Sequence, residues 1–257
     1  MADMNPYKAP DAAVADVATG QGGDAVSVPA GNGWQWIADA FALFKQQPAL
    51  WIGVTIVFFL MLIVLQIIPV IGALGAYLLA PVLAGGLMLG CRAQERGEGL
   101  TFNHLFAGFS TNTSNLVVVG VLMLVAIVIA VAIVLIIFGA GMLALFMGGG
   151  SKAVTGGSIS IMTVMLAALV MVGLSVPIYM AVWFAPALVV FRGLSAVEAM
   201  KASFGACLKN IVPFIVYSVV VFVLGIIATI PVGLGWFVLG PILVIAVYTT
   251  YKDIFQE

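Results

Sequence analysis

Long apolar runs without a single charged side chain dominate this sequence and restrict what it can fold into. They cover residues about 49–69, 71–91, 116–146, 158–191, 211–231 and 233–250. About 20 apolar residues suffice for a helix to cross the hydrocarbon core of a bilayer. The runs are continuous and lack the residue-by-residue alternation of barrel strands, which favours helices. The sequence therefore predicts an all-α integral membrane protein with six transmembrane helices.

The composition excludes several other classes of protein. Of the 257 residues, 64% are hydrophobic and 7% are charged, against about 45–50% and 25% in an average soluble domain. The net charge of −1 provides no basic stripe, so we predict no nucleic-acid partner. Cys91 and Cys207 have no CxxC spacing and no Cys or His neighbours in the sequence, so we predict no metal site, no redox motif and no cofactor. We predict no disulfide, because both cysteines fall on the side that the basic residues below assign to the cytoplasm.

Two regions follow from the distribution of apolar residues. Residues 1–33 are rich in Ala, Gly, Pro and Asp and are predicted to form a disordered, acidic N-terminal tail, because they contain too few large apolar side chains to form a core. No signal-peptide pattern is recognised there. Residues 34–257 are predicted to form one polytopic transmembrane domain.

The distribution of basic residues predicts the orientation, because Lys and Arg near helix ends stay in the cytoplasm. One set of loops and ends contains Lys8, Lys45, Arg92, Arg96, Arg192, Lys201, Lys209 and Lys252. The opposite side contains only Lys152. Both termini are therefore predicted to be cytoplasmic.

An internal repeat is the second organising feature of the chain. Each unit is predicted to contain an interfacial helix, a spanning helix, a tight turn and a second spanning helix, giving three repeated hairpins. The second spanning helix of each unit carries a small residue followed by proline, at Pro81, Pro186 and Pro241. Because proline removes a helical hydrogen bond and clashes with the preceding turn, we predict structural kinks there, sheltered from lipid by neighbouring helices.

The predicted interfacial helices are amphipathic. In the first, we predict that Trp34, Trp36, Phe41 and Phe44 anchor the chain at the headgroup boundary. The last begins with Ser195-Ala-Val-Glu198, a predicted capping box. The third spanning run is longer than a span needs, so its last turns are predicted either to protrude from the membrane or to break near Gly139 and Gly141.

Several short stretches resemble a known family. They are Trp36-Ile37, Leu43-Phe44, the Pro-Val-Ile-Gly run at Pro69, Cys91-Arg-Ala-Gln-Glu95 and Leu105-Phe-Ala-Gly-Phe109. Over roughly residues 34–255, the chain resembles an uncharacterised family of proteobacterial six-span inner-membrane proteins. These are similar in layout to the membrane domain of some glycerophosphodiester phosphodiesterases. The resemblance implies a fold and a location in the bacterial inner (cytoplasmic) membrane, and no chemistry.

The sequence offers little for catalysis or ion transport. No predicted span has a charged residue in its middle, where one usually marks a transport or proton pathway. The only histidine, His104, is interpreted as an interface residue. The Gly86-Leu-Met-Leu-Gly90 pattern permits close helix packing, within the chain or in a homo-oligomer.

These observations favour a non-enzymatic protein that organises or assists membrane partners or lipids. The alternative is a carrier or channel for an uncharged or lipidic substrate, gated by the proline-containing helices. A cavity ringed by Pro81, Pro186 and Pro241 would favour the carrier, and a solid core the organiser. The predicted partners are the lipid bilayer and, as alternatives, another membrane protein or a second copy of the chain.

Overall fold

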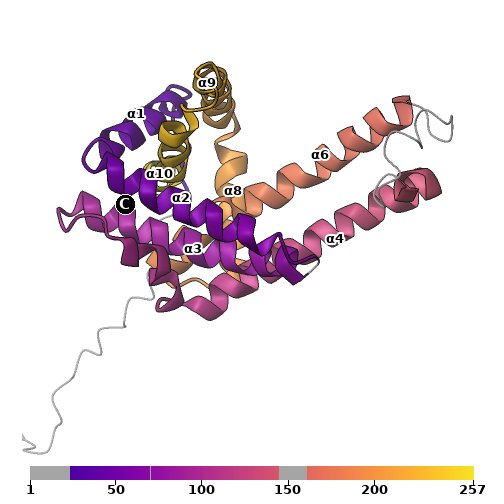
Figure 1. Ribbon diagram of the computed structural model, residues 1–257, viewed down its shortest axis with the longest axis horizontal. Coiled ribbons are helices and arrows are strands. Elements are labelled where there is room, and N and C mark those ends of the chain that lie inside the picture. The colour runs from indigo at the N-terminus through magenta and orange to yellow at the C-terminus, as the bar shows by residue number, and fades with distance from the viewer. Residues whose placement is uncertain (1–23, 70, 145–160) are drawn as a thin grey trace, which may run out of the picture.

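The computed structural model describes residues 24–69, 71–144 and 161–257, and its regular elements in these ranges are helices (Figure 1). In chain order they are α1 (Asn32–Phe44), α2 (Pro48–Leu65), α3 (Ile71–Glu95), the 3₁₀ helix η1 (Phe102–Phe109), α4 (Thr113–Ala144), α6 (Ile161–Trp183), α7 (Ala185–Arg192), α8 (Ala196–Lys209), α9 (Ile211–Thr229) and α10 (Trp236–Phe255). The predicted all-helical fold is confirmed.

Six stretches within the described residues are long and apolar enough to cross a membrane, as predicted. They are Pro48–Leu65, Ile71–Glu95, Thr113–Gly139, Ile161–Arg192, Ile211–Thr229 and Trp236–Phe255. The break predicted near Gly139 is confirmed, because this residue has a φ of 69° inside α4. The predicted end of that run at residue 146 lies outside the described residues.

A short helix precedes each pair of long helices in the described ranges. α1 precedes α2 and α3, η1 precedes α4 and α6, and α8 precedes α9 and α10. We call these the first, second and third pairs. The capping box predicted for α8 is confirmed, since Ser195 and Glu198 exchange side-chain and backbone hydrogen bonds. That the pairs are copies of one repeated unit stays a prediction.

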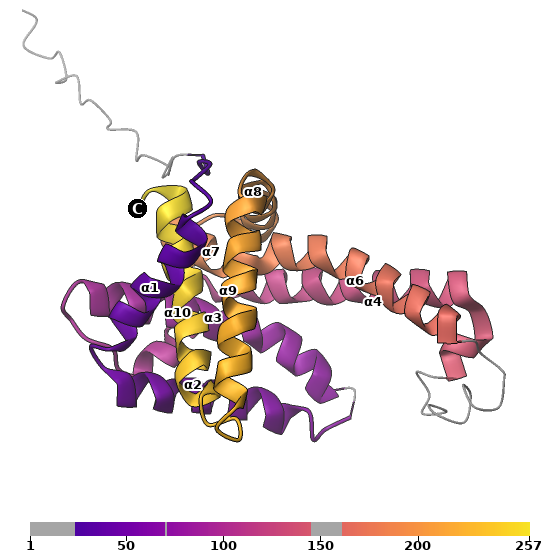
Figure 2. The same ribbon diagram turned by 90° about the horizontal axis from the view of Figure 1, so that it is seen from above.

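The pairs diverge from a common base. Figure 1 shows α4 and α6 running side by side away from the rest of the molecule, and Figure 2 shows α9 and α10 running at a steep angle to them. We call the base the hub: it comprises α1, η1, α7, α8 and the adjoining ends of the long helices. The hub contains the main hydrophobic core, whose largest fully buried side chains include Trp36, Trp51, Phe184 and Tyr251.

The chain before α1 also contacts the hub. The amide of Val26 donates to the carbonyl of Ile254 at 2.9 Å. Buried Asn210, between α8 and α9, binds the carbonyl of Val26 and the amide of Val28, each at 2.9 Å. Residues 24–31 were predicted to belong to the disordered tail. The structure corrects this prediction, because Val26 and Val28 form hydrogen bonds with the hub. Residues 1–23 of that tail lie outside the described residues.

Close backbone contact joins α3 to η1 and depends on glycine. A Cβ added at Gly86 would lie 2.4 Å from the carbonyl oxygen of His104, and one added at Gly108 would lie 1.9 Å from that of Val82. Gly90 instead faces side chains, because a Cβ added there would lie 2.7 Å from a methyl group of Leu100 and 3.1 Å from the Cβ of His104. Of the two interpretations of the Gly86 to Gly90 pattern, packing within the chain or in a homo-oligomer, the structure supports packing within the chain.

Candidate functional site

The three singled-out prolines occupy different local settings. Pro81 and Pro241 are buried inside the continuous helices α3 and α10. Pro186 lies in the first turn of α7, just after the helical run is interrupted at Phe184. A further proline, Pro177, lies inside α6 and was not among the predicted kinks.

At Pro81, a neighbouring helix covers the carbonyl that loses its partner. Proline has no amide N–H, so Pro81 cannot donate to the carbonyl of Tyr77. The backbone of α4 approaches this carbonyl at Gly120, where an added Cβ would lie 2.3 Å from the oxygen of Tyr77. A neighbouring helix therefore covers the carbonyl, which is the shelter from lipid predicted for Pro81.

The interruption between α6 and α7 is completed by a side chain from α8. The hydroxyl of Ser203 accepts a hydrogen bond from the amide of Phe184 at 2.9 Å and donates one to the carbonyl of Met180 at 2.7 Å. In an unbroken helix these two backbone groups would bond to each other. Ser203 is fully buried, so it replaces a lost backbone bond in a place without water. Sequence reasoning missed Ser203, which shows no motif.

Two of the three prolines line a shared apolar cavity. It has a volume of about 270 Å³ and lies between α3, α6, α7 and α10. Pro81 and Pro186 line it, together with side chains such as Met88, Tyr179 and Val244. Pro241 instead lines a separate groove between α2 and α10. The proline-containing helices therefore meet around one cavity, but the prolines do not form a single ring.

Two larger apolar grooves flank the third pair. The α2–α10 groove has a volume of about 590 Å³, and its lining includes Thr55, Phe59, Trp236 and Pro241. The α6–α9 groove has a volume of about 840 Å³, and its lining includes Val176, Trp183, Ile215 and Ser218. Each lies between helices of two neighbouring pairs. Figure 2 shows α9 running at a steep angle to α6, its partner across the second groove. Each is a concave, mainly apolar surface of a size usual for ligand sites.

One residue of each groove lining has a buried polar atom without a hydrogen-bond partner. In the described part of the chain, the buried side-chain polar atoms that lack a partner are the hydroxyl of Thr55 and the indole nitrogen of Trp183. Thr55 is only 4% exposed and lines the α2–α10 groove. Trp183 lines the α6–α9 groove and the proline cavity. Both atoms have almost no accessible surface, so the missing bonds are a local cost inside the protein and not contacts open to a ligand in the grooves.

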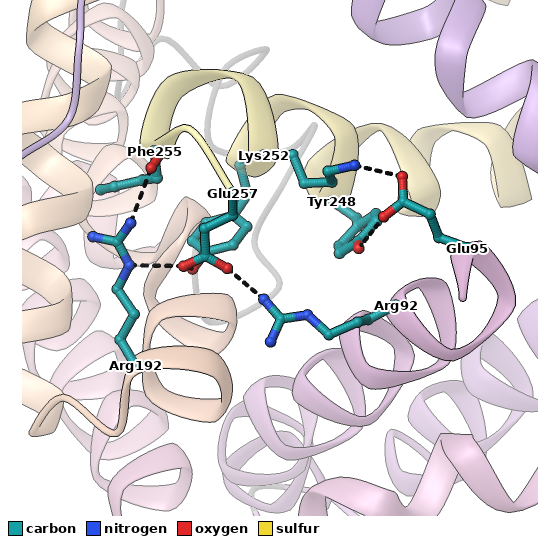
Figure 3. Close-up of polar contacts among 8 residues, drawn as sticks. Arg92, Glu95, Arg192, Tyr248, Lys252, Phe255 and Glu257 are labelled. Carbon is teal, nitrogen blue, oxygen red and sulfur yellow. Dashed lines mark hydrogen bonds and ion pairs between the residues drawn. The ribbon is translucent and has the colours of Figure 1, made fainter. Parts of the chain in front are cut away.

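A cluster of charged and polar side chains fastens α10 to the other hub helices (Figure 3). The carboxylate of Glu257 pairs with Arg92 of α3 and with Arg192 of α7, the latter at 2.9 Å, and accepts a hydrogen bond from Tyr251. Beside it, Glu95 pairs with Lys252 and accepts a hydrogen bond from the hydroxyl of Tyr248 at 2.7 Å. We call this set the clasp; its members are Arg92, Glu95, Arg192, Tyr248, Tyr251, Lys252 and Glu257.

Electrostatics in the clasp favour the ionised form of Glu257. Burial alone would raise the pKa of this carboxyl. The hydrogen bonds from Tyr251 and Arg192 and the charges of Arg92 and Arg192 outweigh burial, so the pKa lies below the ordinary value for glutamate. Arg92 also lies over the ring of Phe191, 3.6 Å from its centroid. The clasp therefore stabilises a fixed arrangement of α3, α7 and α10.

A polar cavity of about 460 Å³ lies next to the clasp, between α1 and α10. Asp253 borders it and accepts hydrogen bonds from Asn32 and from the indole of Trp36, each at 2.7 Å. Asp39 and Lys252 also line this cavity. Its bonded side chains fasten α1 onto α10.

The predicted interface anchors divide into two groups. Trp34 and Phe41 are exposed, at 55% and 42%. Trp36 and Phe44 are buried, with Trp36 packed against Phe214 of α9 at a ring separation of 5.2 Å. Trp34 and Phe41 are thus the two placed to reach a headgroup boundary, and anchoring by them stays a prediction.

Two side chains of types common in catalysis, His104 and Cys207, lie outside the clasp. His104 is bonded within its own turn, and Cys207 is buried. His104 caps η1, with its Nδ1 atom 3.0 Å from the amide of Thr101. Burial raises the pKa of the Cys207 thiol to about 12, which keeps it protonated and poorly nucleophilic at neutral pH. Within the described residues, no group of three or more His, Cys, Asp or Glu is placed to hold a metal ion.

Comparisons with known proteins give a location and no chemistry. Residues 67–155, about a third of the chain, match a family described as predicted integral membrane protein (DUF2189). The chain is also 27% identical over 205 residues to a probable inner membrane protein of Burkholderia thailandensis, covering 78% of this chain and 76% of that protein. No solved structure matches significantly. The layout of the glycerophosphodiester phosphodiesterase membrane domain is not shown by these matches. Together with the six apolar stretches, they indicate a multi-pass membrane protein that is similar to a probable inner membrane protein.

Proposed function

We propose that this chain is a non-enzymatic inner-membrane protein that organises or assists membrane partners or lipids. The observation that carries the proposal is the pair of apolar grooves between diverging helices, joined to a base that the clasp holds together. Grooves of this kind accept an apolar guest that enters sideways from the bilayer. The charged side chains of the clasp pair with one another across α3, α7 and the C-terminal end of α10. This pairing supports a structural role for them.

Photocrosslinking in native membranes tests this proposal. A benzoylphenylalanine placed at Val176 would face the α6–α9 groove, and one placed at Val125 of α4 provides a matched control. The two valines are similarly exposed, at 52% and 48%, and Val125 does not line this groove. We expect Val176 to give a defined adduct, of one protein or one lipid class, that Val125 does not give.

A protein adduct supports the proposal only when two further conditions are met. The same protein must purify with the chain in stoichiometric amount, and the adduct must vanish when that protein is deleted. If both positions gave the same mixture of bulk lipids, the groove would hold no specific guest and the organiser role would be contradicted.

The alternative function is a carrier for a lipidic substrate, and the cavity between Pro81 and Pro186 favours it. The interruption at Phe184 would then provide the moving part, with Ser203 keeping its backbone groups bonded. Replacing Pro81, Pro186 and Pro241 by alanine, one at a time, tests this role in liposome flux assays. Lipid flux in the wild type that falls in the variants would support the carrier. No wild-type flux, or the same flux and folding in all three variants, would contradict it.

A further inference from the structure

The second pair reaches further from the hub than the third pair does. The two pairs share a level near the hub, where Trp183 at the end of α6 lies against Phe214 and Tyr217 of α9, with ring centroids 5.9 and 6.2 Å apart. From Phe214, α9 continues to Thr229 over a rise of about 23 Å, whereas α6 extends from Trp183 to Ile161 over about 33 Å. Measured along its own axis, α6 is therefore the longer arm by about 10 Å.

The far part of the second pair is too apolar to stand in water. Ile136 of α4 and Met162 of α6 are 81% and 79% exposed. Neither α4 nor α6 contains an Asp, Glu, Lys or Arg that could hold this part at a membrane surface. Leaving such helices in water forfeits the transfer free energy that draws a span into hydrocarbon. We therefore expect the full length of α6 to stay within the hydrocarbon core.

A longer arm fits the same bilayer only when it is inclined. If α9 follows the membrane normal, α6 reaches the same far surface at a tilt of about 45°, the angle whose cosine relates about 23 Å to about 33 Å. By its total length alone, about 35 Å against a core of about 30 Å, α6 needs a tilt of about 30°. Figure 2 shows α9 running at a steep angle to α6, so the two helices cannot both follow the normal. The greater length assigns the larger tilt to α6.

Both helices of the second pair join the hub at a break in helical geometry. Asn112, just before α4, has a φ of 55°. α6 is interrupted at Phe184, beyond which α7 is fixed to the clasp through Arg192. The helical bond between Met180 and Phe184 is replaced by bonds to Ser203, so a change of angle there does not have to break it. The second pair can therefore turn against a hub that the clasp holds fixed.

We propose that the second pair crosses the bilayer obliquely, and that its tilt follows the thickness of the bilayer through bending at Phe184. In a thin membrane the pair inclines further from the normal, and in a thick membrane it rises toward α9. The far end of the α6–α9 groove is thus wide in a thin membrane and narrow in a thick one. This device goes beyond the proposed function, because it requires no guest in the groove.

Electron paramagnetic resonance of a bifunctional spin label in aligned bilayers measures the tilt of each helix. The label bridges two cysteines four residues apart on one helix face, in a full chain that lacks its native thiols. Met165 and Leu169 are replaced for α6, and Val219 and Val223 for α9 as the matched control, because all four side chains are exposed. The chain is reconstituted in phosphatidylcholine bilayers with shorter or longer acyl chains, giving hydrocarbon cores of about 27 and about 33 Å.

The lengths of the two helices set the expected result. We expect α6 to be tilted by about 40° in the thin bilayer and about 20° in the thick one, while α9 stays within about 20° of the normal and below α6 in both. A tilt of α6 no larger than that of α9 would overturn the oblique crossing. The same tilt of α6 in both bilayers would overturn the bending at Phe184.

Two features of the design keep the test decisive. If replacing Met165 and Leu169 prevented folding, the exposed side chains of Met162 and Leu166 would take the label about one turn away. An adduct at Val176, or its absence, changes neither tilt, so this proposal and the proposed function fail separately.

Discussion

At the scale of single residues, Ser203 makes the interrupted α6–α7 helix possible. Ser203→Ala would leave the amide of Phe184 without a partner and the carbonyl of Met180 with only the weak bond from the thiol of Cys207 at 3.6 Å. Because both groups are distant from water, we expect a loss of about 1–3 kcal/mol in the free energy of unfolding. Thermal unfolding in detergent measures it, with Ser218→Ala as the matched control that should change little. Equal stability of the two variants would mean that Ser203 is dispensable.

Also at the residue scale, Glu257 is expected to make the stability of the hub depend on pH. Its pKa is lower in the folded chain than in the unfolded chain. Its contribution is therefore complete above the unfolded value of about 4.3 and is lost as the pH falls below it through the folded pKa. Unfolding temperatures measured from pH 7 down to pH 3 should fall less steeply for Glu257→Gln than for the wild type. Parallel curves would contradict a role for this carboxylate.

At the scale of elements, the contact between α3 and η1 depends on the absence of side chains. Gly86→Ala would force a Cβ against the carbonyl of His104, where backbone has to move. We expect it to destabilise the protein by about 1–3 kcal/mol or more, as in other overpacked cores. Gly205→Ala in α8 is the control, because an added Cβ there meets nothing within 4 Å. Thermal unfolding compares the two, and tolerance of Gly86→Ala would show that the contact is looser than described.

The elements could be predicted from the sequence because an apolar run long enough to span a membrane depends only on local composition. The break at Gly139 and the cap at Ser195 are also local features. The hub could not be predicted, since its bonds join residues far apart in the chain, such as Trp36 with Asp253. For the same reason, the burial of Trp36 was missed: an amphipathic pattern shows an apolar face, but not whether lipid or α9 and α10 cover it.

At the scale of the whole molecule, the basic residues predict that the hub lies on the cytoplasmic side. Cysteines introduced at Gln256, beside the clasp, and at Val232, in the turn between α9 and α10, test this orientation. A thiol reagent that cannot cross the inner membrane should label Val232→Cys and spare Gln256→Cys in intact spheroplasts. The native thiols of Cys91 and Cys207 are buried, and a variant without them serves as background. The reverse labelling pattern would place the hub outside.

The central claim of this account is that the helix pairs diverge and leave grooves open to the bilayer. Spin labels at Val176 and Ile215, on opposite walls of the α6–α9 groove, test it most directly in reconstituted vesicles. Oxygen concentrates in lipid, so its collisions with a label report contact with the hydrocarbon. We expect both positions to be as accessible to oxygen as Val125 on α4, and inaccessible to a water-soluble nickel complex. Protection of both positions from oxygen would show that α6 and α9 close against each other, and would contradict the open grooves.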